Sequence, residues 1–172
     1  MELPKFKYSP NAYEIDVFKI EKGICSCCNN ERNLRYTGSF YSIKEPEFIC
    51  PWCIQNGEVA EMFDGGFNDY AGIENDQIIT KDAFLEVTKR TPSYVSWQQE
   101  VWLTHCKEPC AFIGYADNKT IEPLIEELSD DIDNNGYEPE IIKEYLSKDG
   151  SLVGYLFQCT NCGKHRLHVD CD

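Results

Sequence analysis

Apolar side chains recur at helical spacing in three segments of the chain, and a fourth segment has the start and stop signals of a helix. Residues 51–62 begin with a proline and end at the glycines of DGGF, and residues 80–90 begin at Thr80, a residue suited to an N-cap. Residues 120–129 and 138–147 place their apolar residues three or four positions apart. The pattern predicts four helices. The aromatic segment 94–104 is consistent with either a helix or a turn.

Other segments have the patterns of extended chain. Residues 1–22 contain a few apolar anchors and predict an extended arm, and residues 34–42 are rich in Tyr, Thr and Phe, as in a strand or hairpin. The C-terminal GSLVGYLFQCTNCGKHRLHVD predicts a strand, a tight knuckle and a second strand. Together these elements predict an α+β fold with a helical middle.

Composition and charge narrow the class of protein. Hydrophobic residues make up 42% of the 172 residues, as in a folded globular chain. No run approaches the roughly 18 apolar residues of a membrane span, and MELPKFKYSP has no apolar signal region, so we expect a cytoplasmic protein. The net charge of −14 disfavours nucleic acid and favours a basic protein partner, although solubility alone also explains it.

Ten cysteines include two pairs that match a structural zinc site. Cys25 and Cys28 enclose two residues, as do Cys50 and Cys53, and tetrahedral zinc takes four thiolates. The order knuckle, hairpin, helix predicts a treble-clef-like module over residues 1–75. Asn29 suits the left-handed backbone of a knuckle. Cys27 should point away from this site and is not expected to be a ligand.

The segment ICPWC also permits a second interpretation. Two cysteines at a helix N-terminus can form a thiol–disulfide redox pair, because the helix stabilises a thiolate. The upstream Cys25 and Cys28 favour zinc over this alternative.

A second group predicts another zinc ion. Cys106 and Cys110 enclose three residues, Cys159 and Cys162 enclose two, and Gly163 suits the knuckle backbone. These residues would belong to a second unit, 76–172, with a C-terminal zinc-ribbon-like hairpin; one domain for the whole chain is the alternative. His105 is an alternative ligand in place of Cys106, but packing next to the site is the more common role of such a histidine.

The remaining candidate chemistry is weaker. His165, His168 and Cys171 would share a metal only if their strand were bent, because residues three apart on a strand face opposite sides. The segment SDDIDNNGY predicts a polar turn, and its aspartates do not match the spacing of a calcium loop. Both four-cysteine groups are closed shells, and no catalytic motif is present, so we do not expect an enzyme. The large aromatic residues fit core packing better than base stacking (Tyr36, Phe40, Tyr41, Trp52, Trp97 and Trp102).

Several of these motifs resemble the CbrC family of bacterial proteins. The resemblance rests on LPKFKYSP, CSCCNNERNLRYTGSFYS, ICPWCIQNGEVAEMFDGGFND, RTPSYVSWQQEVWLTHCKEPCAFIG and LFQCTNCGKHRLHVD. The eight paired cysteines match the family's pattern. The resemblance implies a cytosolic bacterial protein with no established enzymatic activity, linked to tolerance of a nuclease colicin.

We therefore expect a non-enzymatic zinc-binding interaction protein that covers a basic nuclease toxin. A redox protein or enzyme that uses the CPWC segment and a zinc-finger regulator bound to nucleic acid are the alternatives. The expected partner surface is the acidic stretch between residues 117 and 149 (Asp117, Glu122, Glu126, Glu127, Asp130, Asp131, Asp133, Glu138, Glu140 and Glu144).

Overall fold

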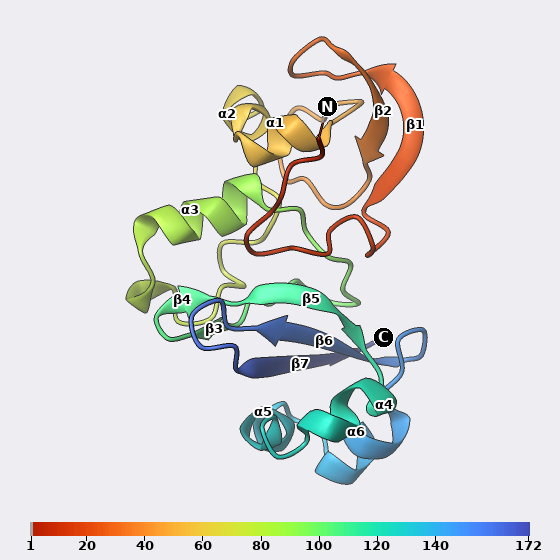
Figure 1. Cartoon of the computed structure of the whole chain (residues 1–172), viewed down its shortest axis with the longest axis vertical. Helices are drawn as coiled ribbons and strands as arrows, with labels where there is room; N and C mark the ends of the chain where they lie inside the picture. The colour runs from red at the N-terminus through yellow and green to blue at the C-terminus, as the bar shows by residue number, and fades with distance from the viewer. Residues whose placement is uncertain (1) are drawn as a thin grey trace.

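The computed structural model describes residues 2–172 as a mixed α+β fold, which confirms the predicted class (Figure 1). Its strands are β1 (Phe18–Ile24), β2 (Glu31–Tyr36), β3 (Thr104–His105), β4 (Glu108–Pro109), β5 (Ala111–Ala116), β6 (Leu152–Gln158) and β7 (His165–Cys171). Its helices are α1 (Pro51–Gln55), α2 (Glu58–Met62), α3 (Lys81–Arg90), α4 (Asn118–Ile121), α5 (Ser129–Asn134) and α6 (Pro139–Tyr145), with 3-10 turns η1 (Asp76–Ile78) and η2 (Glu122–Leu124).

The N-terminal part combines an antiparallel hairpin with short helices. Strands β1 and β2 pair from Phe18 opposite Tyr36 to Ile24 opposite Glu31, with a bulge between Ile20 and Gly23. Helix α1 contacts β2, and α2 and α3 lie next to α1 on the side away from the hairpin (Figure 1). Here the chain brings the knuckle between the strands close to the start of α1.

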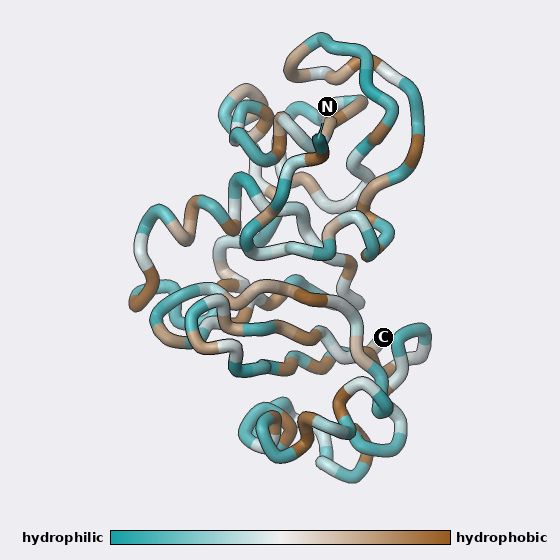
Figure 2. The backbone as a smooth tube through the Cα atoms, viewed as in Figure 1, coloured by the Kyte–Doolittle hydropathy of each residue, from teal (hydrophilic) through white to brown (hydrophobic). Residues whose placement is uncertain are grey.

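The C-terminal part is built on the antiparallel sheet β5-β6-β7. Helices α4, α5 and α6 form a layer on the side of this sheet opposite the N-terminal part (Figure 1). We call residues 117–146 the helical layer. Apolar and hydrophilic positions alternate along it, as expected for helices with one buried face (Figure 2).

Both faces of the sheet are buried. One face joins a cluster that runs from the N-terminal arm to the aromatic residues around Tyr94, which is fully buried and stacks on Phe112 at a centroid distance of 4.4 Å. The other face packs on the helical layer through residues such as Leu156 and Ile132. Burial on both sides fixes the register of the strands, since a one-residue slip would exchange the two faces.

Strand β7 lies at the edge of the sheet, and carboxylates of the helical layer bind its outward N–H groups. The backbone N–H of His165 donates to Oε1 of Glu127 over 2.7 Å, and that of Leu167 donates to Oδ2 of Asp131 over 2.8 Å. Edge strands expose unpaired donors to other chains, so these two bonds satisfy groups that would otherwise be open.

Several predicted elements differ in extent. The expected helix 51–62 is divided at Gly57, whose φ of +83° is left-handed. The expected helix 120–129 is wrong: α4 passes into a 3-10 turn at Pro123, because proline cannot donate the next helical hydrogen bond. The segment predicted as a polar turn contains α5 instead, since the buried Ile132 anchors it to the sheet.

In segment 94–104 the helical alternative is excluded, and the N-terminal arm differs from the prediction. Residues 94–102 form no continuous helix; Val95 N–H donates to the Tyr115 hydroxyl and Trp97 N–H to the Tyr155 hydroxyl, which replaces helical bonding. The arm is extended only up to a series of turns, after which β1 begins. Among residues 2–172, no helix is both long and apolar enough to cross a bilayer.

Candidate metal centres

The first candidate site lies between the β1–β2 turn and the start of α1. Cys25 and Cys28 come from the turn, where Asn29 adopts a left-handed φ of 55° and its N–H donates to Cys25 O over 2.9 Å. Cys50 is the N-cap of α1, and Cys53 lies in its first turn, after Pro51. The fixed φ of proline suits this position, so the sequence determines where both sulfurs point.

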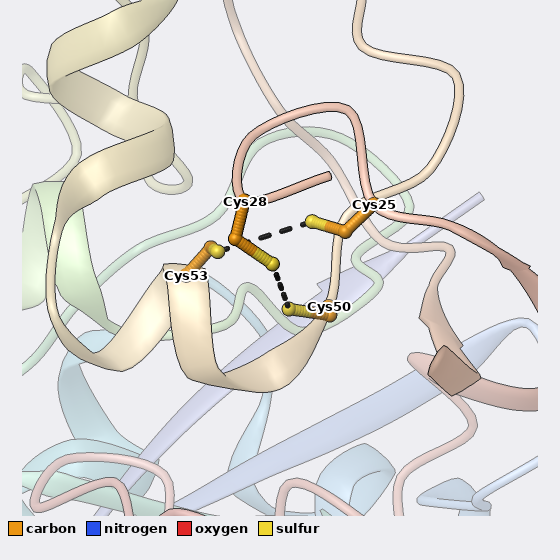
Figure 3. A group of neighbouring side chains, drawn as sticks. All are labelled: Cys25, Cys28, Cys50 and Cys53. Atoms are coloured by element: carbon orange, nitrogen blue, oxygen red, sulfur yellow. Dashed lines mark hydrogen bonds between the residues drawn. The ribbon is translucent and has the colours of Figure 1, made fainter. Parts of the chain in front are cut away.

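The four sulfurs have the spacing of a tetrahedral site. Their ligand atoms lie within 4.8 Å of one another, with 3.8 Å from Cys25 to Cys53 and 4.0 Å from Cys28 to Cys50. A zinc–sulfur bond of about 2.3 Å gives sulfur–sulfur edges of about 3.8 Å in a regular tetrahedron. Figure 3 shows the four side chains pointing toward one another. This group could therefore hold a metal ion.

Without a cation, these buried thiols cannot all ionise. The hydrogen bond from Cys50 lowers the pKa of Cys25 to about 4, and the same bond raises the pKa of Cys50. Burial raises the pKa of Cys53. Of these three thiols, only Cys25 is thus favoured as a thiolate in the metal-free group. A divalent cation removes this conflict, because thiolates are the species that bind it.

Arg32 of β2 supplies positive charge beside this group. Its Nη2 lies 4.0 Å from Cys28 Sγ, and its guanidinium stacks 4.7 Å from the ring centroid of Trp52. Burial disfavours the charged guanidinium, but the neighbouring Cys50 and Cys28 sulfurs raise the pKa of Arg32 overall. Four thiolates and one divalent ion have a net charge of −2, which this guanidinium partly offsets.

The second candidate site joins two distant turns. Cys106 lies in the β3–β4 turn next to His105, and Cys159 and Cys162 lie in the β6–β7 turn. Nδ1 of His105 is 3.3 Å from Cys106 Sγ and 3.3 Å from Cys162 Sγ. Zinc bonds of about 2.3 Å to sulfur and about 2.0–2.1 Å to nitrogen give edges of about 3.5–3.6 Å, so one imidazole and three sulfurs fit this site.

The second candidate site differs from the predicted four-cysteine group at Cys110. The group consists of His105, Cys106, Cys159 and Cys162, and the fully buried Cys110 is not part of it. The backbone explains why His105 takes the place predicted for Cys110. Cys106 and Lys107 are both left-handed, with φ of 53° and 59°, so the turn closes before Cys110. Burial raises the pKa of the Cys110 thiol to about 12, as expected for a packed thiol among apolar groups.

Electrostatics at the second site favour one thiolate in particular. Burial opposes ionisation of Cys159, but the backbone N–H groups of Cys162 and Asn161 hold its pKa at about 6. Gly163, with φ of +78°, allows the backbone to fold around this sulfur, as predicted for the knuckle. The hydrogen bond with Cys162 raises the pKa of Cys106 to about 11.

An ion-pair network holds the second site in place. Arg166 donates to Thr104 O over 2.6 Å, one residue before His105, and pairs with Glu74 at 3.1 Å and Asp131 at 2.9 Å. Its side chain is 18% exposed, so these bonds are mostly shielded from water. Arg166 therefore links β7, β3 and the helical layer at the base of the site.

Other predicted residues have different surroundings. His165 pairs with Glu127 at 3.0 Å, and His168 stacks on Tyr155 with centroids 5.7 Å apart. Burial lowers the pKa of His168. Neither histidine, nor Cys171, belongs to a possible metal group among residues 2–172. All ten thiols are free of disulfide bonds.

Comparison with known proteins identifies the family of the chain. The model of an uncharacterised protein family, UPF0167, matches residues 3–171. The chain belongs to the UPF0167 family. The UPF0167 protein PA1536 of Pseudomonas aeruginosa is 36% identical over 177 residues, covering 99% of this chain and 97% of its own. The UPF0167 proteins Mb2317 of Mycobacterium bovis and MT2352 of Mycobacterium tuberculosis are each 32% identical over 176 residues, covering 98% of this chain and 94% of theirs.

No solved structure matches the chain. The comparisons thus show the UPF0167 family, whose description assigns no activity, and none of them carries the CbrC name. The two candidate metal centres are accordingly the features of this UPF0167 chain from which a function can be argued.

Proposed function

We propose that this chain is a non-enzymatic protein held together by two structural zinc ions. The first ion binds Cys25, Cys28, Cys50 and Cys53 in a treble-clef-like module. The second binds His105, Cys106, Cys159 and Cys162 between two hairpin turns. The observation that supports this most is the sulfur spacing of 3.8 and 4.0 Å in the first group, which fits a tetrahedral thiolate site.

Zinc fits both donor sets better than other common ions. Thiolate and imidazole ligands in a tetrahedral array favour zinc over the hard cations, which prefer oxygen. Four protein ligands leave no open position, and a zinc ion bound this way contributes folding free energy rather than an activated water. Each ion joins segments that are far apart in the sequence, such as residues 105–106 and 159–162.

Metal analysis of the purified full-length chain tests this proposal. We expect two zinc ions per chain, with Cys50→Ser and Cys162→Ser each retaining one. Cys171→Ser is the matched control, because Cys171 lies outside both groups and should keep two. A folded, metal-free protein that forms a reversible Cys50–Cys53 disulfide would instead support the redox alternative. Protein without metal and without that disulfide would also refute the zinc proposal.

We further propose that the helical layer binds a basic protein. Seven of its carboxylate side chains are exposed (Glu122, Glu126, Asp130, Asp133, Glu138, Glu140 and Glu144). Asp117 instead caps α4, Glu127 and Asp131 bind β7, and none of these three is needed to form the acidic surface. The resemblance to the CbrC family suggests a cationic nuclease toxin as the partner, and the net charge of −14 would speed such an association.

A salt series tests the acidic surface. We expect binding to a basic nuclease domain that weakens steeply as the salt concentration rises, because the exposed charges are screened. Replacing the seven carboxylates by their amides should abolish it. A matched control neutralises seven exposed carboxylates elsewhere, namely Glu14, Asp16, Glu45, Glu47, Asp64, Asp76 and Asp82. No binding at low salt, or equal loss in both variants, would contradict this role of the layer.

A further inference from the structure

A third set of metal-binding side chains lies against the first site. Cys27, Cys53 and Glu58 each offer one ligand atom, and these atoms lie within 4.8 Å of one another. Cys53 Sγ is 3.8 Å from Oε2 of Glu58. Cys53 thus belongs to two groups at once: the first site, where it lies 3.8 Å from Cys25, and the third set with Cys27 and Glu58.

Local backbone geometry accounts for this convergence. Cys27 lies inside the knuckle between Cys25 and Cys28, and the residue is 8% exposed. The left-handed Gly57 turns the chain after α1 and is the N-cap of α2. Glu58 is the first residue of α2 and therefore lies beside Cys53. The Glu58 N–H also donates to Oδ1 of Asn56 over 3.0 Å, which holds this turn in position.

Two members of the third set, Cys27 and Glu58, line a cavity that is open to solvent, whereas Cys53 is buried behind them. A cavity of about 340 Å³ is lined by Cys27, Glu58, Glu61 and Met62. The carboxylates of Glu58 and Glu61 at its wall attract cations. A cation can therefore approach this set without passing through the first site.

We propose that Cys27, Cys53 and Glu58 bind one further thiophilic divalent cation, with the Cys53 thiolate bridging it to the ion of the first site. This inference rests on the proposed function, since the bridge needs an ion held by Cys25, Cys28, Cys50 and Cys53. Binding releases the proton of the Cys27 thiol to solvent, and no oxidant or reductant takes part. Two thiolates and one carboxylate suit Zn²⁺ or Cd²⁺, and disfavour Mg²⁺ and Ca²⁺.

Titration of the zinc-loaded full-length protein with Cd²⁺ tests the third site. The readout is the total number of zinc and cadmium ions per chain after excess metal is removed, together with the thiolate-to-cadmium absorbance. We expect three ions in the native chain and two in Cys27→Ser. Glu58→Gln should weaken the third ion by at least about tenfold, because one charged ligand is lost. Cys171→Ser should keep three.

The outcomes separate the two proposals. A total of two ions in the native chain overturns the third site and leaves the two structural sites standing. A total below two refutes the proposed function itself. Should Cys27→Ser also lose first-site zinc, the exposed Glu58→Gln variant decides: three ions bound with unchanged affinity would overturn the third site.

Discussion

Cys162 Sγ lies 3.3 Å from Nδ1 of His105, although the two residues are 57 positions apart. This contact brings an imidazole, not a fourth sulfur, to the second candidate centre. The ligand set can be tested directly, because the nearby Cys110 is not part of this group and serves as a comparison.

His105→Ala should reduce the zinc content from two ions to one, since the second site would keep only three ligands. Cys110→Ala should retain both ions and lose about 1–3 kcal/mol of unfolding free energy through the cavity that it leaves. Metal analysis and denaturant unfolding of both variants check this. Loss of zinc from Cys110→Ala with full zinc in His105→Ala would restore the four-cysteine assignment.

Arg32→Ala should weaken zinc binding at the first site. Its guanidinium lies beside Cys28 Sγ, and outer groups of this kind contribute about 10- to 100-fold to metal affinity. Competition with a chromophoric chelator measures the effect. The control is Arg35→Ala on the same strand. Arg35 pairs with Glu21 at 3.0 Å, and neither residue belongs to the first site. Equal affinity in both variants would show that Arg32 has no part in holding the ion.

The Glu74–Arg166 pair should make stability depend on pH. Burial opposes ionisation of Glu74, but Arg166 and Thr104 lower its pKa below the ordinary value of 4.5. The stabilisation is therefore complete above about pH 4.5, and it is lost as the pH falls through the lower value of the folded state. Unfolding free energies between pH 6 and pH 3 check this. Glu74→Gln should flatten the dependence; an unchanged slope would contradict it.

Arg166→Met should destabilise the fold by about 3–5 kcal/mol, because it leaves two partly buried carboxylates without their partner. The matched control is Arg35→Met, where an exposed pair should contribute only about 0–1 kcal/mol. Denaturant midpoints with unchanged slopes give both values. A cost for Arg166→Met no larger than that of the control would show that the network contributes little.

Tyr94→Phe should cost about 1–3 kcal/mol, because the hydroxyl donates to Val101 O over 2.6 Å and accepts from Val101 N–H over 2.8 Å. Both partners would lose a bond within the aromatic core. Tyr145→Phe, on an exposed side chain, serves as the control. Thermal unfolding distinguishes them, and equal midpoints would contradict the role given to Tyr94.

The sequence predicted the first group of cysteines because each pair lies within a single turn. A two-residue gap places both sulfurs on one side of a knuckle or helix start, whatever the rest of the chain does. The choice between His105 and Cys110 could not be predicted, because it depends on a turn whose two residues are both left-handed. Neither Cys106 nor Lys107 favours that conformation, so no local signal marks it.

Tertiary contacts also determine the structure of two segments that the sequence pattern did not predict. Helix α5 consists of SDDIDN, which has few helix-forming residues, but Ile132 is buried against the sheet and Asp131 pairs with Arg166. Segment 94–102 looked like an element of its own, yet its N–H groups bond to side chains of β5, β6 and β7. Such long-range partners leave no periodic pattern in the sequence.

The two carboxylates that bind the outer edge of β7 have a consequence for self-association. An open edge strand can pair with the same strand of a second molecule, and Glu127 and Asp131 occupy the N–H groups of His165 and Leu167 where such pairing would begin. Because both carboxylates come from the helical layer, the sheet is protected only after that layer has docked. A chain whose layer docks late leaves these N–H groups of β7 open to pairing with another chain in the interval.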